Sequence, residues 1–238
     1  MNGRWAYAAF MIAAGVVFLL LKQLIPSPKK YTALPWNVRF CLAAGGLVGG
    51  VIGAKLPFVL SVEPDSSFWL ADGKTITTGL IGAYIAVELV KLLVGVTFKT
   101  GDRFAIPLAA AVAVGRWGCF YNGCCHGEPT NLPWGVDFGD GVPRHPTQIY
   151  ESAFHLLMAG VLTLCFVRGW FVTHRLQLYL ICYGLYRFGT EFIRPEVKLG
   201  LGLTYYQYTS AVIVLGCALQ WCWEARQAKA KVPAEPVS

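Results

Sequence analysis

Polar side chains that could do chemistry concentrate in residues 115–151, between two long apolar runs. Arg116 and Arg144 lie near the two ends of this stretch, and His145, Gln148 and Glu151 follow the second arginine. A guanidinium group matches a phosphate group through two parallel hydrogen bonds. The stretch therefore predicts a functional site that binds an anionic ligand.

A second set of polar residues recurs along the apolar segment 174–194. Tyr183, Arg187, Glu191 and Arg194 are spaced by four, four and three residues, which places them on one face of a helix. A charge at the centre of a membrane helix costs about 2.5–3.5 kcal/mol on insertion scales. This face must therefore meet the protein interior or a wet cavity. It is either a structural ladder between helices or, as we favour, an anion site in which arginines outnumber acids.

Three cysteines and a histidine cluster at Cys119, Cys124, Cys125 and His126, whereas the other five of the eight cysteines lie in apolar runs. The cluster admits a zinc site, a disulfide, a redox-active thiol pair, or packing of small residues around a lipid head group. C-x4-C-C-H is not a standard zinc spacing, and a redox pair would be expected to show CxxC. We favour packing, and we expect neither a metal ion nor a cofactor.

The composition identifies the environment of these residues. Of 238 residues, 55% are hydrophobic and 14% are charged, whereas soluble domains have about 25% charged residues. The net charge is +7, but we find no basic low-complexity tail, zinc-finger spacing or sizeable soluble domain. The chain is therefore predicted to be an integral membrane protein that binds membrane lipid and no nucleic acid.

Apolar periodicity predicts an all-α helical bundle of about seven transmembrane helices in a single domain, 1–238. The candidate spans are 5–25, 36–60, 75–97, 103–122, 146–168, 174–194 and 203–224, with an outer loop at 123–145. With the N-terminus outside and the C-terminus inside, the cytoplasmic segments hold 12 of the 20 Lys and Arg residues but only 4 of the 13 acids. The positive-inside rule therefore favours this orientation.

Small and paired residues predict how some helices pack. The span 36–60 carries overlapping GxxxG spacings, and Gly79 and Gly82 follow in the next span. Such glycines let helices approach closely in lipid, although a smooth wall for a lipid tail is the alternative. Glu88 and Lys91 are three residues apart and predict a local ion pair.

Pro146 suits the first turn of a helix. Gln148, Glu151 and His155 then follow on one face. His155 is either a core histidine or a site residue. The helix macrodipole favours Glu151 near the helix start and gives this acid a structural reason to be there.

Three motifs in this order resemble the bacterial prolipoprotein diacylglyceryl transferase family. They are GRWGCFYNG, RHPTQIYE and YGLYRFGTEFIRP, and the family segments read roughly GRxGNFxNGE, RHPxQLYE and YGxxRFxxEFxR. The resemblance covers about residues 75–215. It implies transfer of a diacylglyceryl group from phosphatidylglycerol to a lipobox cysteine thiol in a preprolipoprotein, with release of glycerol 1-phosphate, at the periplasmic side of a bacterial inner membrane.

The resemblance also implies site residues. Arg116 and Arg187 would bind the phosphate and share catalysis with His145. The remaining residues of the predicted substrate site are Asn122, Arg144, Gln148, Glu151, Tyr183, Glu191 and Arg194.

The chain departs from the family pattern at three motif positions and in an N-terminal W-Y-G motif, which is reduced to Trp5-Ala6-Tyr7. Thr77 lies where the family has a histidine, and Cys119 and Cys124 replace an asparagine and a glutamate. Activation of the thiol would then pass to His145 or His126. The alternatives are a related transferase that uses phosphatidylglycerol with another acceptor, a membrane thiol oxidoreductase that uses Cys119, Cys124 and Cys125, or a non-catalytic lipid-binding protein.

Overall fold

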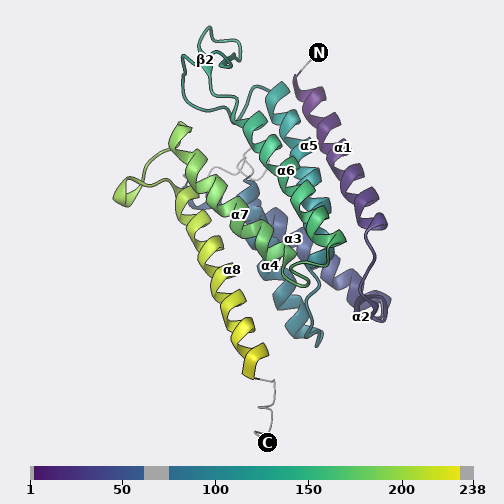
Figure 1. The fold of residues 1–238 in the computed structure, drawn as a ribbon. Helices are drawn as coiled ribbons and strands as arrows, with labels where there is room; N and C mark the ends of the chain where they lie inside the picture. The colour runs from purple at the N-terminus through teal and green to yellow at the C-terminus, as the bar shows by residue number, and fades with distance from the viewer. Residues whose placement is uncertain (1–2, 62–74, 231–238) are drawn as a thin grey trace, which may run out of the picture. The chain divides into compact units, whose positions relative to one another are not determined.

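The computed structural model describes residues 3–61 and 75–230, and these residues are mostly helical (Figure 1). Among them, five helices are long and apolar enough to cross a membrane: Gly3–Leu24, Trp36–Pro57, Ile76–Leu93, Asp102–Tyr121 and Thr147–Val167. The chain is therefore a multi-pass membrane protein. Seven spans remain a prediction. The chain forms two compact units, a smaller unit of residues 27–100 and a larger unit of residues 1–26 and 101–238.

The smaller unit contains α2 (Lys29–Thr32) and a closely packed pair of helices, α3 (Trp36–Ser61) and α4 (Ile76–Leu93). A Cβ atom added at Gly53 would lie 2.3 Å from the carbonyl oxygen of Thr78. One added at Gly82 would lie 2.2 Å from the carbonyl oxygen of Gly49. Only glycine permits this approach of two backbones, so the predicted close packing is confirmed.

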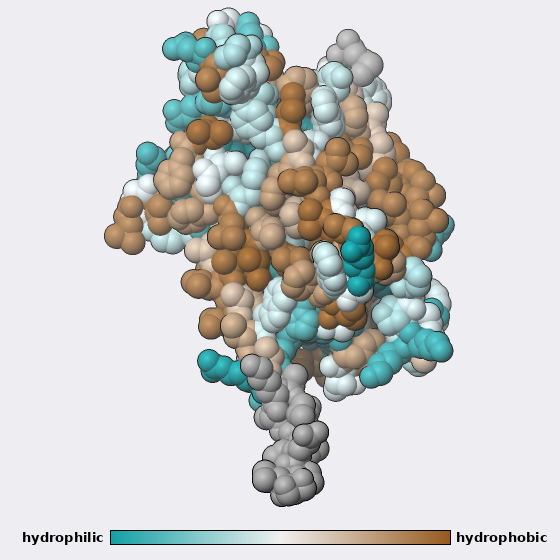
Figure 2. Space-filling model, viewed as in Figure 1, coloured by the Kyte–Doolittle hydropathy of each residue, from teal (hydrophilic) through white to brown (hydrophobic). Residues whose placement is uncertain are grey.

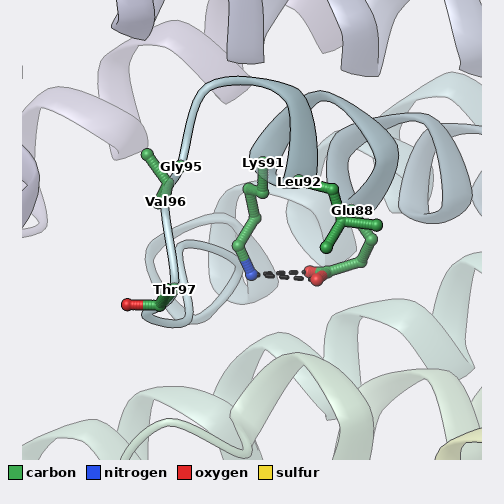
Figure 3. Close-up of a pocket in the computed structure, with 6 residues that line it drawn as sticks. All are labelled: Glu88, Lys91, Leu92, Gly95, Val96 and Thr97. Carbon is green, nitrogen blue, oxygen red and sulfur yellow. Dashed lines mark hydrogen bonds and ion pairs between the residues drawn. The ribbon is translucent and has the colours of Figure 1, made fainter.

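The C-terminal end of α4 carries the predicted local ion pair. Lys91 Nζ lies 2.9 Å and 3.0 Å from the two carboxylate oxygens of Glu88. The two side chains point toward each other beside a pocket of about 320 Å³ (Figure 3). The pocket is lined by Glu88, Lys91, Leu92, Gly95, Val96 and Thr97. Its charges are paired with each other, which gives the pocket no surplus charge for a ligand.

The larger unit is built from α1 (Gly3–Leu24), α5 (Ala105–Tyr121), α6 (Thr147–Val167), α7 (Arg175–Thr190) and α8 (Tyr205–Ala230). Helix α1 packs on α5, α5 on α6, and α7 on α8. The short 3-10 helices η2 (Asp102–Phe104), η3 (Glu191–Ile193) and η4 (Gly200–Gly202) begin or join them. Strands β1 (Val136–Asp137) and β2 (Pro143–Arg144) pair antiparallel in the loop between α5 and α6.

The helices of the larger unit place the loop and the basic residues at opposite ends. The N-terminus of α1 and the β1–β2 loop lie at one end, and the C-terminus of α8 lies at the other (Figure 1). At that second end, Lys22 lies in the last turn of α1, Arg103 lies in η2 before α5, and Arg175 begins α7. The polar loop is thus separated from these basic residues by the length of the helices.

The outer surface of α1 is apolar, as lipid contact requires. Ala6 is its one buried residue among those described, whereas Ile12 and Leu24 are 69% and 76% exposed. Figure 2 shows apolar side chains over α1 and polar side chains over the β1–β2 loop. In water such a face would be a large exposed hydrophobic patch, whereas in a bilayer it contacts lipid tails.

The prediction of one continuous helix over 174–194 is wrong at its end. Helix α7 ends at Thr190, and the chain continues as the 3-10 turn η3 before Arg194 adopts extended backbone angles of −113° and 142°. Pro195 explains the stop, because a residue that precedes proline is driven out of the helical region. Helical periodicity therefore aligns Tyr183 with Arg187, while Glu191 and Arg194 are positioned by the turn.

Candidate active site

Glu151, in the second turn of α6, is the centre of a buried charge cluster. Its side chain is 1% exposed. Arg116 of α5 forms an ion pair with Oε2, and Nη2 of Arg194 donates to the same oxygen over 3.3 Å. The hydroxyl group of Tyr183 of α7 donates to Oε1 over 2.9 Å. Helices α5 and α7 and the turn after α7 thus converge on one carboxylate of α6.

Arg187 and Glu191 form a second buried ion pair within the cluster. Arg187 Nη2 lies 2.9 Å from Glu191 Oε2, and both side chains are at most 5% exposed. The guanidinium group of Arg187 also lies over the ring of Tyr206 in α8, 4.8 Å from its centroid. A cation over a tyrosine ring is stabilised electrostatically. Arg187 is therefore held from two sides.

The cluster has more cations than anions. Its arginines are Arg116, Arg187 and Arg194, and its carboxylates are Glu151 and Glu191. Within the described part of the chain, Arg187 Nη1 is buried without a hydrogen-bond partner. A buried cation that lacks a counter-charge is costly. An anionic ligand would supply both the missing charge and the missing acceptor.

The start of α6 fixes the cysteine-containing loop that follows α5. Gln148 Nε2 donates to the carbonyl oxygen of Cys124, and Thr147 Oγ1 donates to that of Cys125, each over 2.7 Å. Ser152 Oγ donates to the carbonyl oxygen of Ala113 over 2.8 Å and joins α6 to α5. Gln148, predicted as a substrate-binding residue, thus holds the loop backbone through its amide nitrogen.

His155 lies in the core below Glu151. It is fully buried, its Nδ1 lies 2.9 Å from the hydroxyl oxygen of Tyr179, and its Nε2 lies 3.8 Å from Glu151 Oε1. This arrangement supports a core histidine that packs beneath the charge cluster.

The three clustered cysteines are close together and free. The Sγ atoms of Cys119, Cys124 and Cys125 all lie within 4.8 Å of one another. Arg116 Nη1 lies 3.9 Å from Cys119 Sγ, so the thiols border the charge cluster. Hydrogen bonds from the thiols of Cys119 and then Cys124 lower the pKa of Cys125, which favours a thiolate there.

Three predicted residues lie closer to the surface than the cluster. His145 is half-buried, with Nδ1 3.3 Å from the hydroxyl oxygen of Tyr150. Asn122 is exposed at the C-terminal end of α5, and Arg144 pairs with Asp140 over 2.5 Å in the loop. Hydrogen bonding by Arg144 lowers the pKa of Asp140. Their roles toward a substrate remain predictions.

Sequence reasoning missed two aromatic supports of the site. Tyr179 lies one turn before Tyr183 on the same buried face of α7, so extending the stripe back by four residues would have identified it. Tyr206 comes from α8, and nothing in the motifs indicates its contact with Arg187.

Comparisons with known proteins identify the family of this chain. The family model described as prolipoprotein diacylglyceryl transferase matches residues 4–223. A phosphatidylglycerol–prolipoprotein diacylglyceryl transferase of Polynucleobacter necessarius is 34% identical over 82% of this chain and 80% of its own length. Those of Clostridium tetani and Cupriavidus necator are 34% and 29% identical, over 82% and 99% of this chain and 82% and 93% of their own.

Proposed function

Because the chain belongs to the prolipoprotein diacylglyceryl transferase family, we propose that its buried arginine–glutamate cluster is the active site of such a transferase. The donor is phosphatidylglycerol, and the acceptor is a cysteine thiol of a prolipoprotein. The reaction forms a thioether and releases glycerol 1-phosphate. The observation that carries this assignment is the surplus of buried guanidinium groups over carboxylates around Glu151 and Glu191.

Arg116 and Arg187 bind the phosphate of the donor lipid in this proposal. Glu191 orients Arg187 through their 2.9 Å ion pair, and Glu151 orients Arg116. As the carbon–oxygen bond breaks, negative charge grows on the departing phosphate. Preorganised guanidinium groups in a dry site stabilise that developing charge strongly.

His145 accepts the proton of the acceptor thiol. A thiolate attacks far better than a thiol, so some group must take this proton. His145 precedes α6 beside the polar loop, with its ring near Tyr150. The substrate site is completed by two residues on its exposed side, Asn122 and Arg144, and by the buried residues Gln148, Tyr183 and Arg194.

Although its contacts divide it into two compact units, we propose that the chain acts as a single transmembrane domain of seven spans in a bacterial inner membrane, with its N-terminus outside and its site at the periplasmic side. The basic ends of α1, α5 and α7 support this orientation, because positive residues are retained in the cytoplasm. The polar β1–β2 loop then lies where a prolipoprotein is accessible.

The test uses purified protein, phosphatidylglycerol vesicles and a lipobox peptide, and mass spectrometry measures the diacylglyceryl product. Arg116→Ala and Arg187→Ala should each lower turnover by at least about 100-fold, since a lost charge-stabilising donor typically has that effect. Arg168→Ala, at an exposed position over Trp170, is the matched control. Normal turnover in both site variants would overturn the assignment.

A second candidate is a transferase that uses the same donor with another acceptor. The replacement of a family histidine by Thr77, and of two further motif residues by Cys119 and Cys124, favours it. Rapid consumption of phosphatidylglycerol with a non-peptide acceptor, and none with the lipobox peptide, would establish this alternative.

A further inference from the structure

Three thiols lie together at the edge of the charge cluster, and the proposed function leaves them without a role. The Sγ atoms of Cys119, Cys124 and Cys125 lie within 4.8 Å of one another. In a tetrahedral zinc site with bonds of about 2.3 Å, sulfur atoms lie about 3.8 Å apart. Side-chain movements of about 1 Å would bring all three to bonding distance.

The loop that presents the thiols is held in an unusual backbone shape. Cys125 has a φ of 65°, in the left-handed region that residues other than glycine rarely adopt. Gly123, with a φ of 66°, allows the turn that precedes Cys124 and Cys125. The reversal carries Cys124 and Cys125 back toward Cys119, whose carbonyl oxygen accepts from the backbone N–H of Cys124 over 3.1 Å.

Buried side chains of α6 maintain this shape. Gln148 and Thr147, at most 1% exposed, donate to the carbonyl oxygens of Cys124 and Cys125 over 2.7 Å each. Neighbouring hydrogen bonds that fix the ligands are a regular feature of metal sites. The arrangement therefore presents the thiols in a fixed geometry.

The charge of the surroundings suits a thiolate–metal group. Three thiolates around one divalent ion carry a net charge of about −1. The neighbouring cluster has one more guanidinium group than carboxylate groups, and Arg116 Nη1 lies 3.9 Å from Cys119 Sγ. Cys125 is exposed while Cys119 and Cys124 are half-buried, which leaves one side of the group open.

We propose that Cys119, Cys124 and Cys125 bind one zinc ion, and that its open fourth position takes the thiol of the acceptor. Sequence spacing alone favoured no metal ion, because adjacent ligands and C-x4-C-C-H match no standard pattern. The folded loop changes that expectation. A zinc site with three protein ligands and an open position is typical of catalysis, whereas a closed site of four ligands is structural.

The metal would help to activate the acceptor thiol, a role for which the family pattern has a histidine at the position of Thr77. The acceptor thiol gives its proton to His145 as its sulfur binds zinc. That sulfur then forms the new bond to the glyceryl carbon with its own electron pair. The carbon–oxygen bond to phosphate breaks, and its electrons leave with glycerol 1-phosphate. This part of the proposal rests on the proposed function, whereas zinc binding itself does not.

The first experiment measures zinc in the full-length protein purified under reducing conditions without chelator. The wild type should hold about one zinc per chain. Ser substitution of Cys119, Cys124 or Cys125 should lower zinc content at least about tenfold at micromolar free zinc, since each removes one of the three ligands. Cys222→Ser, at an exposed free cysteine of α8, should retain it.

Cobalt then reports on the open position. Co²⁺-substituted protein should show thiolate-to-cobalt bands that shift when a lipobox peptide with cysteine is added, and no shift with its serine analogue. This readout requires no turnover, so it remains informative if Arg116→Ala and Arg187→Ala show the transferase assignment to be wrong.

Three outcomes would overturn the proposal. They are zinc below about a tenth of an ion per chain while all three thiols are free to alkylate, a Cys119–Cys124 disulfide in the active enzyme, and copper(I) as the bound metal, which thiolates also favour. If neither peptide shifts the cobalt absorption bands, the proposed binding of the acceptor thiol at the fourth metal position is wrong.

Discussion

The hydroxyl group of Tyr183 donates a 2.9 Å hydrogen bond to Oε1 of Glu151 and so joins α7 to α6 inside the charge cluster. Glu151 also receives Arg116 and Arg194 on its other oxygen. One carboxylate therefore sets the positions of three side chains that reach it from different parts of the chain. Substitutions of the residues that contact Glu151 should therefore distinguish effects on the stability of the fold from effects on catalytic turnover.

Replacement of Tyr183 by phenylalanine should destabilise the fold. A hydrogen bond to a charged group contributes about 1.5–3 kcal/mol, and Tyr183→Phe leaves a lone pair of buried Glu151 without its donor. Thermal unfolding in detergent should show a lower midpoint. Tyr186→Phe is the control, because its ring stacks on Phe154 at 4.2 Å and phenylalanine keeps that contact. Equal midpoints for the two variants would contradict the role of this hydroxyl.

The variant Arg187→Lys should fold but should turn over substrate slowly. An ammonium group keeps the charge but not the planar fork that pairs with both Glu191 and a phosphate. Arg187→Lys should lower kcat/KM for phosphatidylglycerol by at least about tenfold, equivalent to about 1.4 kcal/mol of lost transition-state binding. Initial rates across a series of lipid concentrations measure it. Unchanged kinetics would mean that a point charge suffices and that the ion pair with Glu191 has no positioning role.

The glycine contact between α3 and α4 should tolerate no side chain. A Cβ at Gly82 meets backbone of α3 at 2.2 Å and 2.9 Å. Overpacking of this kind costs about 1–3 kcal/mol, so Gly82→Ala should lower the unfolding midpoint. Gly160→Ala in α6 is the matched control, since its Cβ would have no neighbour within 4 Å. Alanine should raise stability there by about 0.5–1 kcal/mol, and opposite shifts in the two variants are the signature expected.

Orientation is accessible to impermeant thiol labelling in cells with a permeabilised outer membrane. Trp134 lies exposed in the loop and Cys222 lies exposed on α8. With the three clustered cysteines replaced by serine, Trp134→Cys should react in intact spheroplasts. Cys222 should react only after lysis. Labelling of Cys222 in intact spheroplasts would reverse the predicted orientation.

The helices were predictable because lipid and backbone leave few choices. An apolar segment in a bilayer must satisfy its backbone internally, and each expected span overlaps a helix, although α7 ends at Thr190, before the expected residue 194. The GxxxG spacings predicted the α3–α4 contact, and the three-residue spacing predicted the Glu88–Lys91 pair. These are local patterns, which a single sequence displays directly.

The centre of the site was harder to predict because it depends on tertiary contacts. The position of Glu151 suggested a macrodipole role, yet it is the shared partner of residues 35, 32 and 43 positions away. The left-handed φ of Cys125 could not be predicted from the sequence, because cysteine disfavours that backbone conformation. The break after Thr190 could have been read from Pro195. Only the fold reveals that three thiols converge.

The distance in sequence between Arg116 and Glu151 also has a consequence during synthesis of the chain. Helix α5 leaves the ribosome 35 residues before the carboxylate that neutralises its arginine. At about 5–20 residues per second this interval lasts roughly 2–7 s. A solitary guanidinium group in lipid is strongly unfavourable. Insertion of α5 and α6 together, as a hairpin joined by the cysteine-containing loop, is therefore energetically favoured over insertion of α5 alone.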